Sequence, residues 1–320
     1  MNNHRISLRD LGIAILTPVC MVFTQDCISA IFQILLKESK ESRDTTIPVS
    51  LFSYTVIILM CIFAFFRYPQ LLHDSSIPTE PSICHSENQV KKAEMKNMSS
   101  LRIFILCILL LITGISIQLL STGILNIIDI HSPNLLKEYK TMVEKSFSLN
   151  NGILRVATVT LVAPIAEELV FRGISLGALQ RFFQTLFTRT TPYKYSSRSK
   201  YCNACAIFIS ALLFGLFHGN VVQFCYAVPS GIILALITVW TSSLLPAIFL
   251  HMTVNISSYM IDSIFSDLSV TAGASGHPSD TFYTAVTAGA CLLCVASLVI
   301  IHLLLFRPYS AKADHSNKIS

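Results

Sequence analysis

The chain has 320 residues, of which 52% are hydrophobic and 13% are charged, with a net charge of +5. Soluble domains carry about 25% charged residues, so this composition argues against a soluble enzyme and for a protein that crosses the bilayer several times. Apolar runs take up most of the length and leave no room for a sizeable separate soluble domain. The basic residues sit in short loops beside these runs, which favours membrane topology over nucleic-acid binding.

The apolar runs predict an all-α protein, a polytopic transmembrane helical bundle of about eight spans. A transmembrane helix needs about 20 apolar residues, and the predicted spans cover residues 11–36, 49–66, 101–128, 152–179, 203–225, 226–240, 244–262 and 282–305. The polar segment 129–151, which has charges of both signs, predicts an interfacial helix.

The distribution of Lys and Arg predicts which side of the membrane each loop occupies. Four segments on one side of an eight-span layout hold 2, 5, 5 and 3 Lys or Arg, whereas the three opposite loops hold 3, 3 and 0. The richer segments are residues 1–10, 67–102, 180–202 and the tail from 307. Since basic loops stay in the cytoplasm, we expect a multi-pass integral membrane protein with both termini cytoplasmic, in the cell or inner membrane if the source is bacterial.

The stretch Pro164–Gly173, PIAEELVFRG, places adjacent carboxylates in an apolar run. Ionised side chains in hydrocarbon cost several kcal/mol each and are a functional-site hypothesis by default. In a helix, Glu168 and Arg172 form an i,i+4 pair in the favourable acid-first order. Glu167 points about 100° away on the helix and must find water, a metal or a donor on another helix.

Two further polar clusters lie downstream at helical spacing. His218 follows Phe214 by one turn on the predicted fifth span, and His251 shares a face of the seventh span with Asn255. A single intramembrane His or Asn is more often a helix–helix contact than a catalytic group. Three helices that each carry one such cluster, in spans otherwise nearly free of charge, favour one shared site.

These groups could activate water. Glu167 and His218 could hold one water and take its proton, while His251 and Asn255 could donate hydrogen bonds to an oxyanion. Alternatively, Glu167, His218 and His251 match the ligand types of a catalytic Zn²⁺ with an open fourth position. The residues leave metal-free and zinc chemistry open, and no other cofactor is expected.

Helix depth conflicts with this grouping. At 1.5 Å per residue, Glu167 and His218 lie roughly 20–24 Å along their helices from the basic loop, and His251 lies roughly 12 Å along its helix from residue 243. Tilt or a funnel-shaped cavity has to absorb the difference.

The motifs EExxxR (Glu167, Glu168, Arg172), FxxxH (Phe214, His218) and HxxxN (His251, Asn255), in that order, resemble those of the CPBP or Abi family. That family comprises CAAX prenyl endoproteases and bacteriocin-processing or immunity-related membrane proteins. The resemblance covers about a third of the chain, residues 152–262, and implies an intramembrane protease. It implies that Glu167 and His218 are the water-activating pair, that His251 and Asn255 are on the oxyanion side, and that Glu168 and Arg172 complete the first motif.

The resemblance divides the chain into three regions. Residues 1–151 hold amino-terminal transmembrane helices and a linker, 152–262 the CPBP-like catalytic region, and 263–320 a loop, the last transmembrane helix and a cytoplasmic tail. The expected partners are the lipid bilayer and a membrane-associated substrate, a prenylated protein tail in CAAX-processing members. Two other functions stay open: a transporter with a polar core, and a non-catalytic immunity or scaffold protein.

Overall fold

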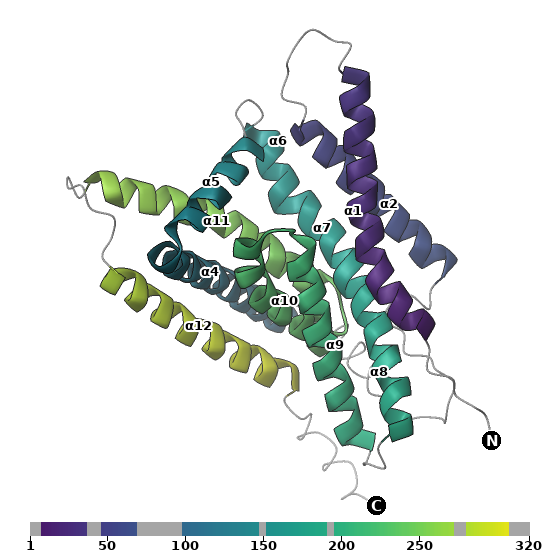
Figure 1. The fold of residues 1–320 in the computed structure, drawn as a ribbon. Coiled ribbons are helices and arrows are strands. Elements are labelled where there is room, and N and C mark those ends of the chain that lie inside the picture. Colours follow the sequence, from purple (N-terminus) through teal and green to yellow (C-terminus); the bar gives the residue numbers. More distant parts are fainter. Residues whose placement is uncertain are drawn as a thin grey trace, which may run out of the picture.

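The structure is a computed structural model that describes residues 8–36, 46–68, 98–146, 152–190, 195–271 and 280–306. These residues form nine helices, which confirms the all-α prediction (Figure 1). The longest continuous helix runs from residue 152 to 190 and contains α6, α7 and α8. The others are α1 (Leu8–Leu36), α2 (Thr46–Arg67), α4 (Ser100–His131), α5 (Pro133–Ser146), α9 (Tyr195–Phe217), α10 (Val221–Thr241), α11 (Leu245–Thr271) and α12 (Asp280–Phe306).

The prediction of about eight spans is wrong: among the described residues, six helices are long and apolar enough to cross a membrane. They are α1, α2, α4, α9, α10 and α12. The predicted fourth span holds four charged residues, Arg155, Glu167, Glu168 and Arg172, and the apolar helix Leu245–Ile261 in α11 is shorter than the six. Both of these helices carry predicted site residues. The charges place the first outside the six, and its length places the second outside them.

The break between α9 and α10 falls at residues 218–220, earlier than the predicted boundary after residue 225. Gly219 has a φ of 63°, a left-handed conformation that glycine adopts without steric cost. Asn220 caps α10, because its side-chain oxygen accepts hydrogen bonds from the N–H groups of Val222 and Gln223. This turn places His218 directly after the last residue of α9.

One half of the bundle is formed by α4, α10, α11 and α12, which share a hydrophobic cluster that includes Leu110, Leu234, Leu250 and Ile301. Helices α11 and α12 both pack against α4 (Figure 1). At Gly114, α11 approaches closely enough that a Cβ atom would lie 2.6 Å from the Thr253 Cγ2 atom. The missing side chain therefore lets α11 lie against α4 and sets the position of His251, two residues before Thr253.

The other half packs α1 and α2 against the helix 152–190. A second cluster joins Met21 of α1 and Ile57 of α2 to Val170 and Phe171. At the end near the basic loop, Arg181 Nε donates to Asp10 Oδ1 at 3.1 Å. The segment with the two glutamates therefore lies between helices from both halves of the chain.

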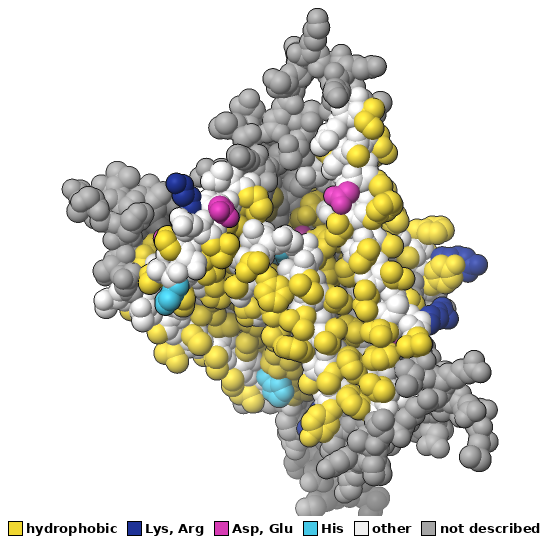
Figure 2. All heavy atoms as spheres, viewed as in Figure 1, with side chains coloured by type: hydrophobic (Ala, Val, Ile, Leu, Met, Phe, Trp, Pro, Cys, Tyr) yellow, Lys and Arg dark blue, Asp and Glu magenta, His cyan; other side chains and the backbone are white. Residues whose placement is uncertain are grey.

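The outer surface suits a bilayer. Figure 2 shows a face covered largely by hydrophobic side chains, with few charged side chains among them. Large apolar residues such as Phe23, Phe63, Phe104 and Leu292 are more than half exposed. Since soluble monomers rarely expose contiguous apolar patches of this kind, the described residues form a multi-pass membrane protein.

Candidate active site

The helix that carries the glutamates changes its winding on both sides of them. It starts as α6 (Gly152–Ala157), widens to a π-helix, η2 (Thr158–Val162), returns to α7 (Ala163–Glu168), and widens again in η3 (Leu169–Ser175) before α8 (Leu176–Thr190). Short π-helical segments occur frequently at functional sites. Glu167 and Glu168 lie at the end of the α-helical turn between the two wide segments.

The missing N–H of Pro164 explains why the Asn255 side chain binds a backbone carbonyl of the helix 152–190. In η2 the N–H of Ala163 bonds to the carbonyl of Thr158, five residues back. The next bond of this pattern would join residue 164 to Val159, but proline has no N–H to donate. Asn255 of α11 takes its place, because its Nδ2 donates to the Val159 carbonyl at 2.9 Å. The backbone hydrogen bond that Pro164 cannot form therefore leaves a carbonyl to which the Asn255 side chain of α11 binds.

This arrangement predicts an energetic coupling between Asn255 and Pro164. Asn255→Leu leaves the Val159 carbonyl without its donor and should lower the unfolding free energy by about 1 kcal/mol. Pro164→Ala restores a backbone N–H, so the double variant should lose less stability than the sum of the single losses. Unfolding of the four proteins in detergent gives this double-mutant cycle. Purely additive losses would contradict the arrangement.

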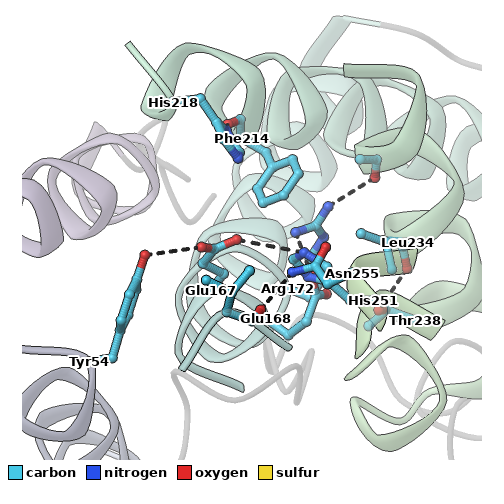
Figure 3. Close-up of polar contacts among 12 residues, drawn as sticks. Tyr54, Glu167, Glu168, Arg172, Phe214, His218, Leu234, Thr238, His251 and Asn255 are labelled. Atoms are coloured by element: carbon cyan, nitrogen blue, oxygen red, sulfur yellow. Dashed lines mark hydrogen bonds and ion pairs between the residues drawn. The ribbon is translucent and has the colours of Figure 1, made fainter. Parts of the chain in front are cut away.

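Glu168 and Arg172 are the most deeply buried charges of the site. Both side chains are 0% exposed, and Arg172 Nη1 donates to Glu168 Oε1 at 2.9 Å, which confirms the predicted i,i+4 pair (Figure 3). Arg172 Nη2 donates to the Gly231 carbonyl of α10 at 3.2 Å. The guanidinium carbon also lies 4.4 Å from the centre of the Phe214 ring, a cation–π distance. Arg172 therefore joins its own helix to α9 and α10.

His251 lies between the two glutamates. Its Nδ1 is 2.9 Å from Glu168 Oε1, and its Nε2 is 3.8 Å from Glu167 Oε2 (Figure 3). An ionised carboxylate only accepts hydrogen bonds, so Nδ1–H is the donor to Glu168. The depth conflict seen in the sequence is thereby resolved, because α11 brings His251 to the level of both carboxylates.

Glu167 is held more loosely than its neighbour. Besides the 3.8 Å approach of His251, its Oε1 lies 3.5 Å from the hydroxyl of Tyr54 on α2. Both distances exceed those of a typical charge-assisted hydrogen bond, although the residue is only 7% exposed. The donors on other helices that the sequence predicts for Glu167 are therefore on α2 and α11. The carboxylate can still accept a further hydrogen bond.

His218 joins this group through an aromatic ring. Its Nδ1 lies 2.8 Å from the Phe214 carbonyl, and because a carbonyl only accepts, Nδ1–H donates and Nε2 is left as the free nitrogen. The Phe214 ring makes edge contacts with both imidazoles, with centroids 4.9 Å from His218 and 5.7 Å from His251. Phe214 therefore separates and orients the two histidines.

Comparison with protein families identifies this part of the chain. Residues 149–257 match the family model described as type II CAAX prenyl endopeptidase Rce1-like. The chain contains a CAAX prenyl endopeptidase domain of this family. This confirms the resemblance to the CPBP family that the three motifs indicate. No curated protein and no solved structure matches the chain.

The CAAX-peptidase domain does not gather the predicted zinc ligands into one group. Among the described residues, no three His, Cys, Asp or Glu side chains are close enough to share a metal ion. The Nδ1 atoms of His251 and His218 bond to Glu168 and to the Phe214 carbonyl, which leaves Nε2 of each ring as the nitrogen that could bind a metal. Within the described part of the chain, however, Glu167, His218 and His251 are not grouped as ligands of one ion. Zn²⁺ at these residues stays a prediction.

Two residues next to the CAAX-peptidase motifs were missed as site residues in the sequence. Tyr54 lies outside the matched segment, and its phenol stands among other hydroxyl residues of α2, so nothing in the sequence sets it apart. Phe214 is part of FxxxH, and its contact with His218 follows from the i,i+4 spacing. Its contacts with His251 and Arg172 depend on helix packing, as does the contact of Tyr54 with Glu167.

Proposed function

We propose that this protein is an intramembrane endopeptidase that uses Glu167 to activate a water for attack on a peptide bond of a membrane-associated substrate. The proposal rests on the difference between the partners of the two adjacent glutamates. Glu168 is paired with Arg172 at 2.9 Å, whereas the polar contacts of Glu167 with the described residues are two long ones, to Tyr54 and His251. A buried carboxylate with spare acceptor capacity is suited to general-base catalysis.

The first step is removal of a proton from water. Glu167 accepts the proton, and the free Nε2 of His218 is a second acceptor that orients the same water from α9. The water oxygen then attacks the peptide carbonyl carbon. Because the two acceptors come from different helices, the packing of Phe214 against both imidazoles determines the geometry of the attack.

The second step stabilises the negative charge on the carbonyl oxygen and protonates the leaving amine. Asn255 keeps one amide hydrogen free after its bond to Val159, and His251 donates from Nε2 when the ring carries both protons. As the C–N bond breaks, Glu167 gives the proton that it took from water to the leaving amine nitrogen, while His251 Nε2, 3.8 Å from Glu167 Oε2, keeps its own proton. Such donors at a developing oxyanion are a major source of rate acceleration.

The substrate class follows from the family. CAAX prenyl endopeptidases act on protein substrates, and CAAX-processing members remove the last three residues of a prenylated tail. We therefore expect a carboxyl-terminal peptide whose prenyl chain lies in the bilayer.

The direct test is cleavage of a farnesylated CAAX peptide by purified protein in liposomes, followed by mass spectrometry. Release of a carboxyl-terminal tripeptide supports the proposal. Proton-coupled solute uptake without any cleavage would reject it in favour of a transporter, and neither activity would favour a scaffold. Inhibition by a chelator that Zn²⁺ reverses would show that a metal takes part.

A further inference from the structure

We infer that Tyr54 is a positioning residue for Glu167, and that α2 therefore belongs to the catalytic assembly although it lies outside the family segment. This inference rests on the proposed function of Glu167. The Tyr54 hydroxyl is 3.5 Å from Glu167 Oε1, and Figure 3 shows the phenol approaching the carboxylate from the side opposite His251.

The two oxygens of Glu167 face different helices. Oε1 faces Tyr54 of α2 and Oε2 faces His251 of α11. With a partner on each side, rotation of the carboxylate about its last torsion would lose both contacts. Glu168 differs, since its Oε1 accepts from both Arg172 and His251. His251 contacts both glutamates, whereas Tyr54 contacts Glu167 and not Glu168.

The packing of its ring fixes the position of the Tyr54 side chain. The Tyr54 ring packs against the cluster that contains Met21 of α1, Ile57 of α2 and Ala166 of α7. Apolar contacts therefore connect α1 and α2 to the helix that carries the carboxylate. In this part of the described structure, the Tyr54 hydroxyl is the polar group that contacts Glu167, so its removal separates positioning from packing.

The test is the rate at which a lipid-soluble carbodiimide labels each glutamate in the full-length protein, read by peptide mass spectrometry. In Tyr54→Phe, labelling of Glu167 should rise by about threefold or more, because a carboxyl group without its donor reorients freely. Labelling of Glu168 should stay constant, because Arg172 and His251 still hold it. The adjacent carboxylate is therefore an internal control for local loosening.

Two further variants control for packing. Tyr54→4-fluorophenylalanine keeps the bulk at the ring position but cannot donate, so it should behave like Tyr54→Phe. Ser53→Ala removes a buried hydroxyl of the same helix that donates only to the Val49 carbonyl within α2 at 2.8 Å, so it should change neither label. Equal rises at both glutamates, or no change at Glu167, would overturn the inference.

Activity supplies a second readout. In Tyr54→Phe, kcat should fall about three- to tenfold with KM unchanged, the effect expected for one hydrogen bond. A wild-type protein that cleaves no peptide would refute the proposed function, while the labelling pattern would still decide whether Tyr54 holds Glu167. A wild-type protein that cleaves, with an equally active Tyr54→Phe variant, would refute the inference alone.

Discussion

Glu167→Gln should reduce peptide cleavage to background, a loss of about 10²–10⁴-fold, which is the usual contribution of a general base. The amide keeps the size of the side chain and can still accept from Tyr54, but it cannot take a proton from water. Because the polar contacts of Glu167 with described residues are long, at 3.5 and 3.8 Å, the variant should fold and express like wild type. Cleavage of a farnesylated peptide in liposomes measures the loss.

The control for this experiment is Glu138→Gln, which removes an exposed carboxylate of α5 and should leave cleavage unchanged. His218→Ala should also abolish cleavage while preserving the fold, since His218 bonds to its own helix rather than to the buried ion pair. Retained cleavage in Glu167→Gln or His218→Ala would refute the assignment of that residue.

Arg172→Met should be the most destabilising single substitution in the site, with a loss of about 3–5 kcal/mol in unfolding free energy. Arg172 and Glu168 are both 0% exposed, so removal of the cation leaves an ionised carboxylate buried without its counter-ion. The contacts with the Gly231 carbonyl and the Phe214 ring are lost at the same time. Thermal or denaturant unfolding in detergent measures the effect.

Adding Glu168→Gln to Arg172→Met should recover much of this stability, because the double variant no longer buries an uncompensated charge. The single variant Arg172→Lys should be less stable than this double variant, since an ammonium group cannot reproduce both the planar stacking on Phe214 and the second bond to Gly231. A double variant as unstable as Arg172→Met would show that shape, rather than charge balance, dominates at this position.

The class of protein and the identity of the site could be predicted because both depend on local pattern. Composition and apolar runs indicate a polytopic helical membrane protein without any knowledge of packing. The Glu168–Arg172 pair follows from the helical repeat alone. The order of the three motifs was sufficient to indicate the family, which the match over residues 149–257 confirms.

The predicted fourth span was counted without regard to the charges that the site introduces, and the helix with Glu167 is not among the six described helices that meet the criteria. The apolar stretch Leu245–Ile261 of α11 falls outside the six because of its length. The turn at Gly219 was also misplaced, since an apolar sequence on both sides hides the break. Capping by Asn220 and the left-handed glycine are the signals that could have located it.

What the sequence by itself determined is which ionisable groups enter the apolar interior and which of them pair along one helix, because the helical period depends only on the backbone. Tertiary structure decided the partners across helices. The tilt of α11 brings His251 between the two glutamates, α2 brings Tyr54 to Glu167, and the missing N–H of Pro164 gives Asn255 its acceptor. These contacts depend on crossing angles and on the positions of helix breaks, which arise from the packing of the whole bundle.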